Sequence, residues 1–509
     1  MSGKHGTPLR GLMSTKSSAL SHGYFGRMFR HLHHGEFGAT DTENISNLGE
    51  LAKAMTSDFD APFDGKDEEE SGIPALYTYL GQFIDHDLTF DPVSTLAKQN
   101  DPDALVDFRT PAFDLDNVYG RGPDDQPYLY DGDKLFLLGG PLQGGGDPNA
   151  RDLPRNTPTD PSKPKRALIG DPRNDENAIV SQLQGLFLRF HNRMVSDNPT
   201  LPLKEVQKLV RYHYQYIVLN DFLPRIVHSS VLSALKTARK FDRKELKYYR
   251  PSNAPFMPVE FSVAAYRLGH SMVRPGYQLN DSILLPIFPV PTKSLPEGLT
   301  GFREMNPNWG IDWGRFVDID TRQYDGNDDI KKRRLQFAYR IDTSAVTPLG
   351  NLPPSVASDP SSLPLRNLLR GWRLGLPTGQ SVAHAMGVAP LEDDQILLGK
   401  FTNDDPNDLT ELTPIATIAG GVFAGNCPLW TYILAETRSF KESVKLPVKE
   451  NVSLLTPRLG PVGGRIVAEV FLGIMFGDGN SYLNKEPNWK PKLGTGYALK
   501  DFVKYALGR

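Results

Sequence analysis

Residues 75–90 combine a long run of hydrophobic positions with four polar ones. The stretch reads Ala-Leu-Tyr-Thr-Tyr-Leu-Gly-Gln-Phe-Ile-Asp-His-Asp-Leu-Thr-Phe and predicts a mostly apolar helix. At about 100° per residue, Gln82 and His86 share one face, whereas Asp85 and Asp87 flank the histidine on opposite sides. Buried carboxylates are costly unless they are paired, metal-bound or covalently used. The pattern predicts a functional site here, although an Asp-His-Asp run alone is also typical of a solvated turn or an ordinary metal-ligand set.

Two further segments place charged side chains on predicted helices. Residues 173–176 read Arg-Asn-Asp-Glu and put an arginine and a glutamate three residues apart, at the entrance to an amphipathic helix that includes residues 181–193. Residues 266–272 read Tyr-Arg-Leu-Gly-His-Ser-Met and lie on a predicted helix that opens near Pro258 and stops at residues 274–276. A single histidine on such a helix is often only a core side chain.

In this order, the three segments resemble the animal-type haem peroxidases of the peroxidase and cyclooxygenase superfamily, most closely the myeloperoxidase and lactoperoxidase branch. The resemblance runs from about residue 76 to residue 377. It assigns distal catalytic roles to Gln82, His86 and Arg173, iron ligation to His270, and haem contacts to Asp85, Glu176, Arg267, Asn367 and Arg370. In this family the asparagine hydrogen-bonds the iron-binding histidine, and the two later arginines lie near the haem propionates.

The chemistry of peroxide reduction explains these residue types. A neutral His86 can take a proton from peroxide and return it to the departing oxygen, a shuttle worth about 10² to 10⁴ in rate. Arg173 stays cationic and would stabilise the negative charge that develops on the outer oxygen. On the other side of the haem, His270 would bind iron, and a hydrogen bond to Asn367 would set its orientation and basicity.

Asp85 and Glu176 match the positions from which relatives in this branch attach haem b through ester bonds. We therefore expect one or two esters once peroxide has turned over in the site. The residue after Glu176 is Asn177, where myeloperoxidase has a methionine that forms an electron-withdrawing sulfonium bond. Without that bond, we expect ready oxidation of iodide, thiocyanate or phenols, some oxidation of bromide and poor oxidation of chloride.

Residues 110–120 read Thr-Pro-Ala-Phe-Asp-Leu-Asp-Asn-Val-Tyr-Gly and resemble the calcium loop of the same family. Calcium prefers six to eight oxygen ligands. The expected ligands are the side chains of Asp87, Thr110, Asp114 and Asp116 and the backbone carbonyl of Ala112. Because Asp87 directly follows His86, such an ion would fix the distal helix. The alternative is an ordinary surface turn rich in Asp and Asn.

Composition and length fit a large enzyme. The 509 residues are 39% hydrophobic, and length alone would suggest about three domains. Because the expected haem ligands come from widely separated segments, we predict instead one mainly α-helical peroxidase domain with little β structure, over residues 73–509. Residues 1–72 are expected to form an N-terminal arm or extension. The remaining histidines are expected to be solvated or structural, namely His31, His33, His34, His191, His213, His228 and His384.

Charge and hydropathy exclude several partners. The net charge of −3 and the pI near 6.4 argue against nucleic acid or an anionic membrane as a main partner. The uncharged stretch between Glu411 and Glu436 is interrupted by proline and glycine, so it predicts buried core and a helix over residues 429–435 rather than a membrane span. No apolar signal core is recognised, which favours a cytoplasmic or non-classically secreted protein. Cys427 is the single cysteine, which favours a reducing compartment or a bacterial source.

The expected activity is reduction of hydrogen peroxide with oxidation of small anions or phenols, as in a response to oxidative stress. The main alternative is a fatty-acid dioxygenase of the cyclooxygenase-like branch. That branch has a radical-forming tyrosine three residues before the proximal histidine, where this chain has Arg267, and Tyr266 points about 100° elsewhere on a helix. A haem-thiolate monooxygenase using Cys427 lacks the usual glycine spacing, and the intact catalytic set argues against an inactive scaffold.

Overall fold

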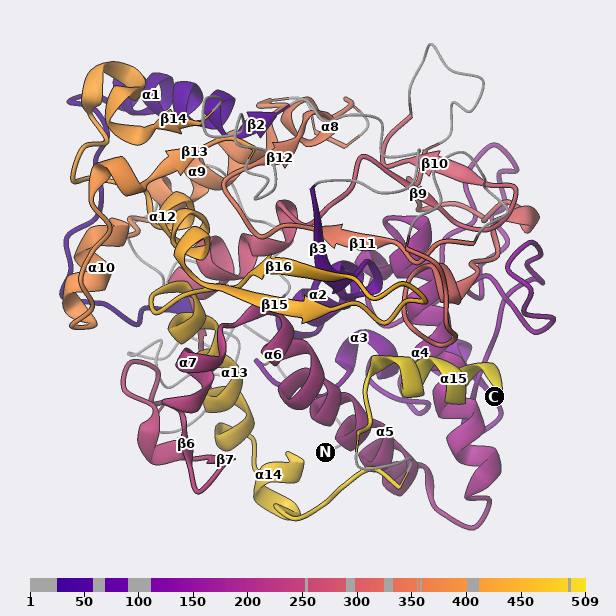
Figure 1. The fold of residues 1–509 in the computed structure, drawn as a ribbon. Coiled ribbons are helices and arrows are strands. Elements are labelled where there is room, and N and C mark those ends of the chain that lie inside the picture. The colour runs from indigo at the N-terminus through magenta and orange to yellow at the C-terminus, as the bar shows by residue number, and fades with distance from the viewer. Residues whose placement is uncertain are drawn as a thin grey trace.

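The computed structural model describes residues 25–57, 69–89, 111–251, 255–289, 298–324, 333–354, 356–357, 359–400, 412–492 and 496–509. Helices provide most of the regular structure in these ranges, and the strands within them form only two-stranded pairs (Figure 1). This confirms the prediction of a mainly α-helical fold with little β structure.

The longer helices are α1 (Asp41–Ala54), α2 (Leu76–Leu88), α4 (Ala178–Asp197), α5 (Leu203–Ile217), α9 (Leu363–Arg373), α12 (Leu429–Glu436), α13 (Gly463–Gly477) and α15 (Leu499–Leu507). The short helices are α3 (Asp116–Tyr119), α6 (Leu223–Ile226), α7 (Ser229–Ser233), α8 (Thr347–Gly350), α10 (Gly379–Ala385) and α14 (Tyr482–Lys485). Antiparallel pairs are β3 (Glu70–Pro74) with β11 (Phe337–Tyr339), β4 (Tyr130–Asp131) with β5 (Leu135–Phe136), β6 (Lys236–Thr237) with β7 (Lys240–Phe241), β9 (Gly276–Gln278) with β10 (Leu284–Pro286), β13 (Leu397–Leu398) with β14 (Thr413–Pro414), and β15 (Lys441–Lys445) with β16 (Ser453–Pro457). Parallel pairs are β1 (Phe25–Gly26) with β8 (Met257–Pro258), and β2 (Thr56–Ser57) with β12 (Ala345–Val346).

Helix α2 lies in the core because aromatic side chains hold it against two other helices. Phe83 of α2 stacks on Phe187 of α4, with ring centroids 4.2 Å apart, and Tyr214 of α5 meets both rings edge-on. Phe502 of α15 covers Phe187 from another direction, at 4.5 Å. Aromatic contacts of this kind combine large buried area with defined geometry. They therefore fix the helix that carries His86.

The segment before His270 is helical, as predicted, but it is not a regular α-helix. Residues Glu260–Ala264 form a π-helical turn and Ala265–His270 form a 3₁₀-helix. Between them, Ala264 departs from helical geometry, with φ −125° and ψ −72°. π-helical turns add a residue and re-aim the side chains that follow, and they are frequent at functional sites. We call residues 260–270 the proximal segment.

Part of the expected N-terminal arm belongs to the main core. Residues 25–57 include the buried side chains of Phe25, Phe29, Leu48 and Leu51, which join the same hydrophobic cluster as the rest of the chain. Helix α1 packs against α9, although the two are far apart in sequence (Figure 1). We call residues 25–37, which precede α1, the strap.

The uncharged stretch contains a buried helix, as predicted. Helix α12 covers residues 429–436 and is buried along its length. Within the described ranges, we find no helix that is both long and apolar enough to cross a membrane.

Candidate active site

His86 lies on α2 and is held by a side chain from a different segment. It is 5% exposed, and its Nδ1 atom is 2.7 Å from Oδ1 of Asn174, in the 3₁₀ turn Pro172–Asp175. The amide of Asn174 donates onward to Oε1 of Gln184 on α4, at 2.8 Å. In this arrangement Nδ1 of His86 donates its proton to Asn174, which leaves Nε2 as a proton acceptor.

Gln82 and Glu176 meet next to that Nε2 atom. Oε1 of Glu176 is 3.6 Å from Nε2 of His86 and accepts a hydrogen bond from the amide of Gln82. Asn177, the N-cap of α4, donates to Oε1 of Gln82 at 3.1 Å. Thus the structure brings together three of the residues that the sequence singles out.

Burial shifts the two titrating groups at this site in opposite directions. It lowers the pKa of His86 to about 4, and the nearby positive charge of Arg173 acts in the same direction. It raises the pKa of the Glu176 carboxyl to about 7, against the influence of Arg173. The carboxylate of Asp85 raises the pKa of both groups. Pairs of groups with opposed shifts are typical of sites that move protons.

Arg173 ties the end of α2 to the turn that carries Asn174. Its Nη2 atom donates to the backbone oxygens of His86, at 3.1 Å, and Thr89. It also forms an ion pair with the buried carboxylate of Asp171, at 2.8 Å. Burial works against the charge, but Asp171 outweighs it and the pKa of Arg173 is raised. The guanidinium therefore stays cationic beside His86.

His270 lies at the end of the proximal segment and is paired with an asparagine as well. Its Nδ1 atom is 2.8 Å from the amide of Asn367, on α9. Burial lowers the pKa of His270 to about 3, and Arg267 contributes to the shift. The half-buried Arg267 donates from Nε to the carbonyl of Ser262 at 3.0 Å, and Arg370 lies one turn after Asn367. The Asn367 atom at this contact is the amide nitrogen, which donates to Nδ1. For Nε2 to serve as a metal ligand, Nδ1 must carry the proton, and the amide of Asn367 would turn over to accept it through its oxygen.

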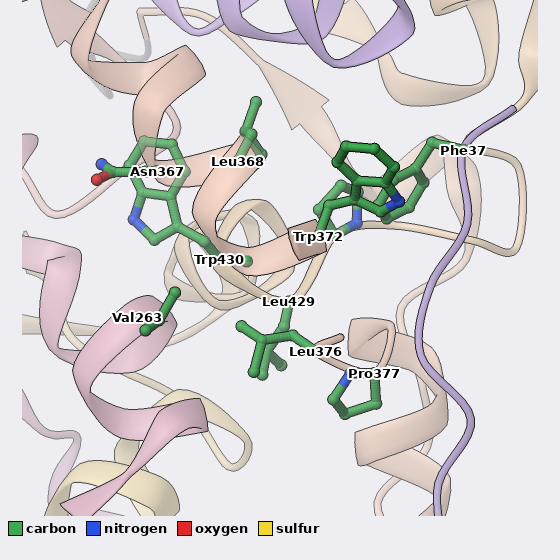
Figure 2. Close-up of a pocket in the computed structure, with 11 residues that line it drawn as sticks. Phe37, Val263, Asn367, Leu368, Trp372, Leu376, Pro377, Leu429 and Trp430 are labelled. Carbon is green, nitrogen blue, oxygen red and sulfur yellow. The ribbon is translucent and has the colours of Figure 1, made fainter. Parts of the chain in front are cut away.

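A small, mostly apolar cavity adjoins Asn367. Figure 2 shows that its walls come from the proximal segment, from α9, from α12 and from the strap. The labelled lining residues are Phe37, Val263, Asn367, Leu368, Trp372, Leu376, Pro377, Leu429 and Trp430. An apolar environment strengthens hydrogen bonds, here the bond between Asn367 and His270.

These donors fit a haem group. Nδ1 of His86 faces the amide oxygen of Asn174, so His86 presents Nε2. His270 is held at Nδ1 by the amide of Asn367 and would present Nε2 to iron with that amide turned over. The two helical elements are also joined, because the hydroxyl of Tyr266 donates to the carbonyl of Gly81 at 3.3 Å. Imidazole is a common axial ligand of haem iron.

The expected calcium loop docks on the distal helix. The amide of Asn117 donates to the carbonyl of Phe83 at 3.2 Å, and the backbone N–H of Asp116 donates to the carboxylate of Asp114 at 3.1 Å. Tyr214 has a pKa well above its usual value, first because of burial and then because of the carboxylates of Asp87 and Asp114. The two carboxylates therefore lie near the same hydroxyl.

The described ranges do not contain a complete calcium site. Asp87 and Ala112 are buried, whereas Thr110 lies outside the described residues. Among the residues that the structure describes, we find no group of three or more His, Cys, Asp or Glu side chains that could hold a metal ion. The predicted carboxylates, Asp87, Asp114 and Asp116, are thus not gathered into one cluster.

The remaining candidates have structural surroundings, as predicted. His31, His33, His34 and His384 are exposed. His191 bonds the hydroxyl of Tyr119 at 3.0 Å and the carbonyl of Lys134 at 2.8 Å. Cys427 is buried, and burial raises the pKa of its thiol well above the usual value.

Three side chains of the site were not assigned a role from sequence. Asn174 holds His86, Asp171 balances the charge of Arg173, and Asn177 binds Gln82. The available signal was the position of Asn174 and Asn177 inside the segment that contains the catalytic arginine. Sequence spacing alone does not show which of these side chains contacts α2, which lies almost a hundred residues earlier in the chain.

One family model matches part of this chain. Residues 95–293 match the family model described as animal haem peroxidase. Over these residues the chain is similar to animal haem peroxidases. The matched residues include Arg173, Glu176, Arg267 and His270, and they begin after α2.

Short stretches of the chain are also similar to proteins named as peroxidases. A peroxidase-like protein from Margaritifera margaritifera is 33% identical over 131 residues, which are 24% of this chain and 16% of that protein. Thyroid peroxidase from Canis lupus familiaris is 31% identical over 118 residues, which are 21% of this chain and 12% of that protein. The matches thus span less than a fifth of the length of these relatives.

Two solved structures have a fold similar to that of this chain. Peroxidase A from Dictyostelium discoideum has a TM-score of 0.58 at 17% identity and covers 93% of this chain and 92% of its own. A fatty acid alpha-dioxygenase from Oryza sativa has a TM-score of 0.50 at 14% identity, covering 96% of this chain and 79% of its own.

Proposed function

We propose that this chain is a haem-dependent peroxidase that reduces hydrogen peroxide and oxidises small anions, such as iodide and thiocyanate, or phenols. The observation that carries the proposal is the presence of two neutral histidines on separate elements, each held at Nδ1 by an asparagine; His86 is buried and His270 is half-buried. Only His86 has an acidic and a cationic side chain beside it. The two histidines are therefore suited to different tasks.

The proximal residues are suited to hold haem b. His270 would supply the iron ligand through Nε2, while Asn367 keeps the ring oriented through Nδ1. Arg267 and Arg370 would pair with the propionates. When bound, haem supplies the two electrons that cleavage of the peroxide bond requires.

The distal residues would move the proton. Nε2 of His86 accepts a proton from the inner oxygen of peroxide and donates it to the outer oxygen, which leaves as water. The fixed charge of Arg173 stabilises the negative charge that develops on that oxygen. Gln82 and Glu176, joined by a hydrogen bond, would orient the incoming peroxide.

Asp85 and Glu176 are proposed to form ester bonds to the haem. A carboxyl oxygen bonds to a peripheral methyl carbon, the carboxyl and the methyl each lose one hydrogen, and one hydrogen peroxide takes up both hydrogens to give two water molecules. The pKa of about 7 leaves much of the Glu176 carboxyl protonated at neutral pH. Loss of freely extractable haem after peroxide treatment would support the esters, and fully extractable haem would contradict them.

Asn177 limits the proposed substrates. Its amide oxygen caps α4 by accepting the backbone N–H groups of Ile179 and Val180 at 3.1 and 2.9 Å, while its amide nitrogen binds Gln82. An asparagine cannot form a sulfonium bond. We therefore propose iodide, thiocyanate and phenols as donors, with bromide weaker and chloride poor. Mass spectrometry of the extracted haem should find no sulfonium adduct.

A single-turnover experiment tests the proposed reaction. Haem-loaded protein is mixed with hydrogen peroxide, and iodide, bromide, thiocyanate, chloride and phenol are then titrated while the haem spectrum is followed. We expect a rapid spectral change with peroxide that iodide, thiocyanate and phenol reverse. No change with peroxide would refute the peroxidase proposal, and efficient chloride oxidation at neutral pH would refute the proposed substrate range.

The alternative of a fatty-acid dioxygenase has less support. Its motivation is the fold shared with the alpha-dioxygenase from Oryza sativa. In this chain Arg267 stands three residues before His270, and Tyr266 directs its hydroxyl to the backbone of Gly81. Oxygen consumption that depends on added fatty acid would favour this alternative.

We also propose a calcium ion between Asp87 and the loop over residues 110–120. The support is the location of Asp87 and Asp114 near the hydroxyl of Tyr214 and the docking of Asn117 on α2. A buried carboxylate such as Asp87 is stabilised by a cation. The ion would fix the end of α2 next to His86.

A further inference from the structure

Glu260 begins the proximal segment and is fully buried. Both of its carboxylate oxygens accept the backbone N–H of Met28, each at 3.1 Å, and one of them also accepts the N–H of Phe29 at 3.0 Å. Burial raises the pKa of this carboxyl, and these hydrogen bonds act in the opposite direction. Burying a carboxylate away from water costs free energy. We therefore expect Glu260 to have a specific role.

The strap, which contacts Glu260 through Met28 and Phe29, also contacts the C-terminal end of α9. Strand β1 pairs with β8 just before Glu260. The guanidinium of Arg27 donates to the carbonyls of Leu374 and Gly375, the latter at 2.9 Å, and Trp372 donates from its indole nitrogen to Glu36 at 2.8 Å. Figure 2 shows the strap, in violet, passing the cavity where it carries Phe37. One short piece of chain therefore binds the proximal segment and α9.

These two elements carry the two partners of the proximal hydrogen bond. His270 ends the proximal segment, and Asn367 lies in α9. Their 2.8 Å contact depends on how the two elements are placed relative to each other. The departure from helical geometry at Ala264 leaves the start of the segment without the continuous hydrogen-bond ladder that would fix it in a regular helix. Besides the backbone bond from Ala265 to Glu260, the carboxylate of Glu260 supplies a side-chain contact that holds that start.

We propose that Glu260 is a positioning residue for His270. By binding the backbone of Met28 and Phe29, it fixes the start of the proximal segment against the strap and thus sets the hydrogen bond between His270 and Asn367. This inference rests on the proposed role of His270 as iron ligand. Partners of metal-binding histidines set the orientation and basicity of the ligand, so Glu260 acts on the iron through the strap and Asn367.

A second buried glutamate offers a matched control. Glu436 is 2% exposed and accepts the backbone N–H groups of Val462 and Gly463 at the start of α13. Glu260→Gln and Glu436→Gln each replace a buried carboxyl group that accepts backbone N–H groups by an amide, with almost no change in volume. A merely stabilising role for Glu260 predicts that both variants lose thermal stability and that neither changes the iron.

The test uses haem-loaded protein and records the iron–histidine stretching band of the ferrous form by resonance Raman, together with the Fe(III)/Fe(II) potential. In Glu260→Gln we expect a lower band frequency and a more positive potential, because a weaker bond to Asn367 makes His270 a poorer donor. We expect wild-type values in Glu436→Gln. Glu260→Asp keeps the carboxylate on a shorter side chain, so the band frequency and the potential should shift in the same direction but by less. This second variant tests the proposal if Glu260→Gln does not fold.

The outcomes separate this inference from the proposed function. Wild-type band and potential in both Glu260 variants would overturn the positioning role alone. Equal shifts in Glu260→Gln and Glu436→Gln would overturn it too, since the effect would then follow from general loosening. Absence of an iron–histidine band in the wild-type protein would overturn the iron ligand and with it the inference.

Discussion

The distal and proximal sides use the same pair of side chains in different surroundings. Nδ1 of His86 is 2.7 Å from the amide oxygen of Asn174, and Nδ1 of His270 is 2.8 Å from the amide nitrogen of Asn367. Burial is the main cause of the low pKa in both histidines. The pair by itself therefore produces only a neutral, oriented imidazole.

The difference lies in what surrounds each ring. His86 sits on a regular α-helix with Glu176 3.6 Å from Nε2 and with Arg173 bonded to its backbone. His270 ends a π and 3₁₀ segment, and its asparagine borders an apolar cavity. Charged neighbours suit proton transfer, whereas an apolar setting suits a permanent metal ligand. The comparison shows that the neighbours, not the histidine–asparagine pair, determine the proposed role.

The largest expected effect is on the proximal side. His270→Ala should lose haem or hold it loosely, because no other side chain is proposed to bind the iron. Haem content per protein and the Soret band measure this, with exposed His384→Ala as a control that should match wild type. A native-like ferric spectrum in His270→Ala would mean that the iron ligand is misassigned.

A smaller but still large effect is expected on the distal side. His86→Ala should keep haem, since the iron ligand lies on another element, and should slow the reaction with peroxide by about 10² to 10⁴. Stopped-flow absorbance of the haem-loaded variant gives this rate. If the first oxidised spectrum forms at the wild-type rate, His86 has no role in proton transfer.

Calcium should change stability near the distal helix. A ligand that binds only the folded protein adds about 2.7 kcal/mol at a hundred times its dissociation constant. Starting from protein shown to be calcium-free, melting temperature should rise with added calcium, and Asp87→Ala should abolish most of the rise. A melting temperature that does not depend on calcium would count against the site.

The smallest expected effect concerns pH. Because folded His86 has a pKa of about 4, the peroxide reaction should stay fast down to about that pH and fall below it. Asn174→Asp places a carboxylate beside Nδ1 and should move this fall to higher pH. A wild-type rate that already falls near pH 6.5 would contradict the buried, neutral imidazole.

The corresponding effects on stability oppose each other. In the unfolded protein His86 has a pKa of 6.5, whereas in the folded protein its pKa is about 4. As pH falls from 6.5 to 4 the unfolded protein binds the proton first, so the contribution of His86 to the free energy of unfolding is lost over that range. For Glu176 the folded form keeps its proton up to about pH 7, so its contribution is lost as pH rises from 4.5 to 7. The kinetic measurement therefore isolates His86 better than a melting curve does.

Sequence reasoning succeeded where chemistry is local. The helix around His86 and the helix that begins after Glu176 follow from composition and spacing, because hydrophobic periodicity is a local signal. The broken geometry of the proximal segment was not predicted, since Ala264 reads as an ordinary helical residue. The contacts of Asn174 with His86 and of Glu260 with the strap join distant segments, and only packing of the whole core brings them together.

The most direct test of the comparison replaces the two asparagines by leucine, which has a similar shape but no hydrogen bond. In haem-loaded Asn174→Leu and Asn367→Leu, the rate of reaction with peroxide and the ferrous iron–histidine stretching band are both measured. We predict that Asn174→Leu slows the peroxide reaction by about 10- to 100-fold with an unchanged band, and that Asn367→Leu lowers the band frequency. A band that shifts in Asn174→Leu, or one that stays unchanged in Asn367→Leu, would contradict the division of roles between His86 and His270.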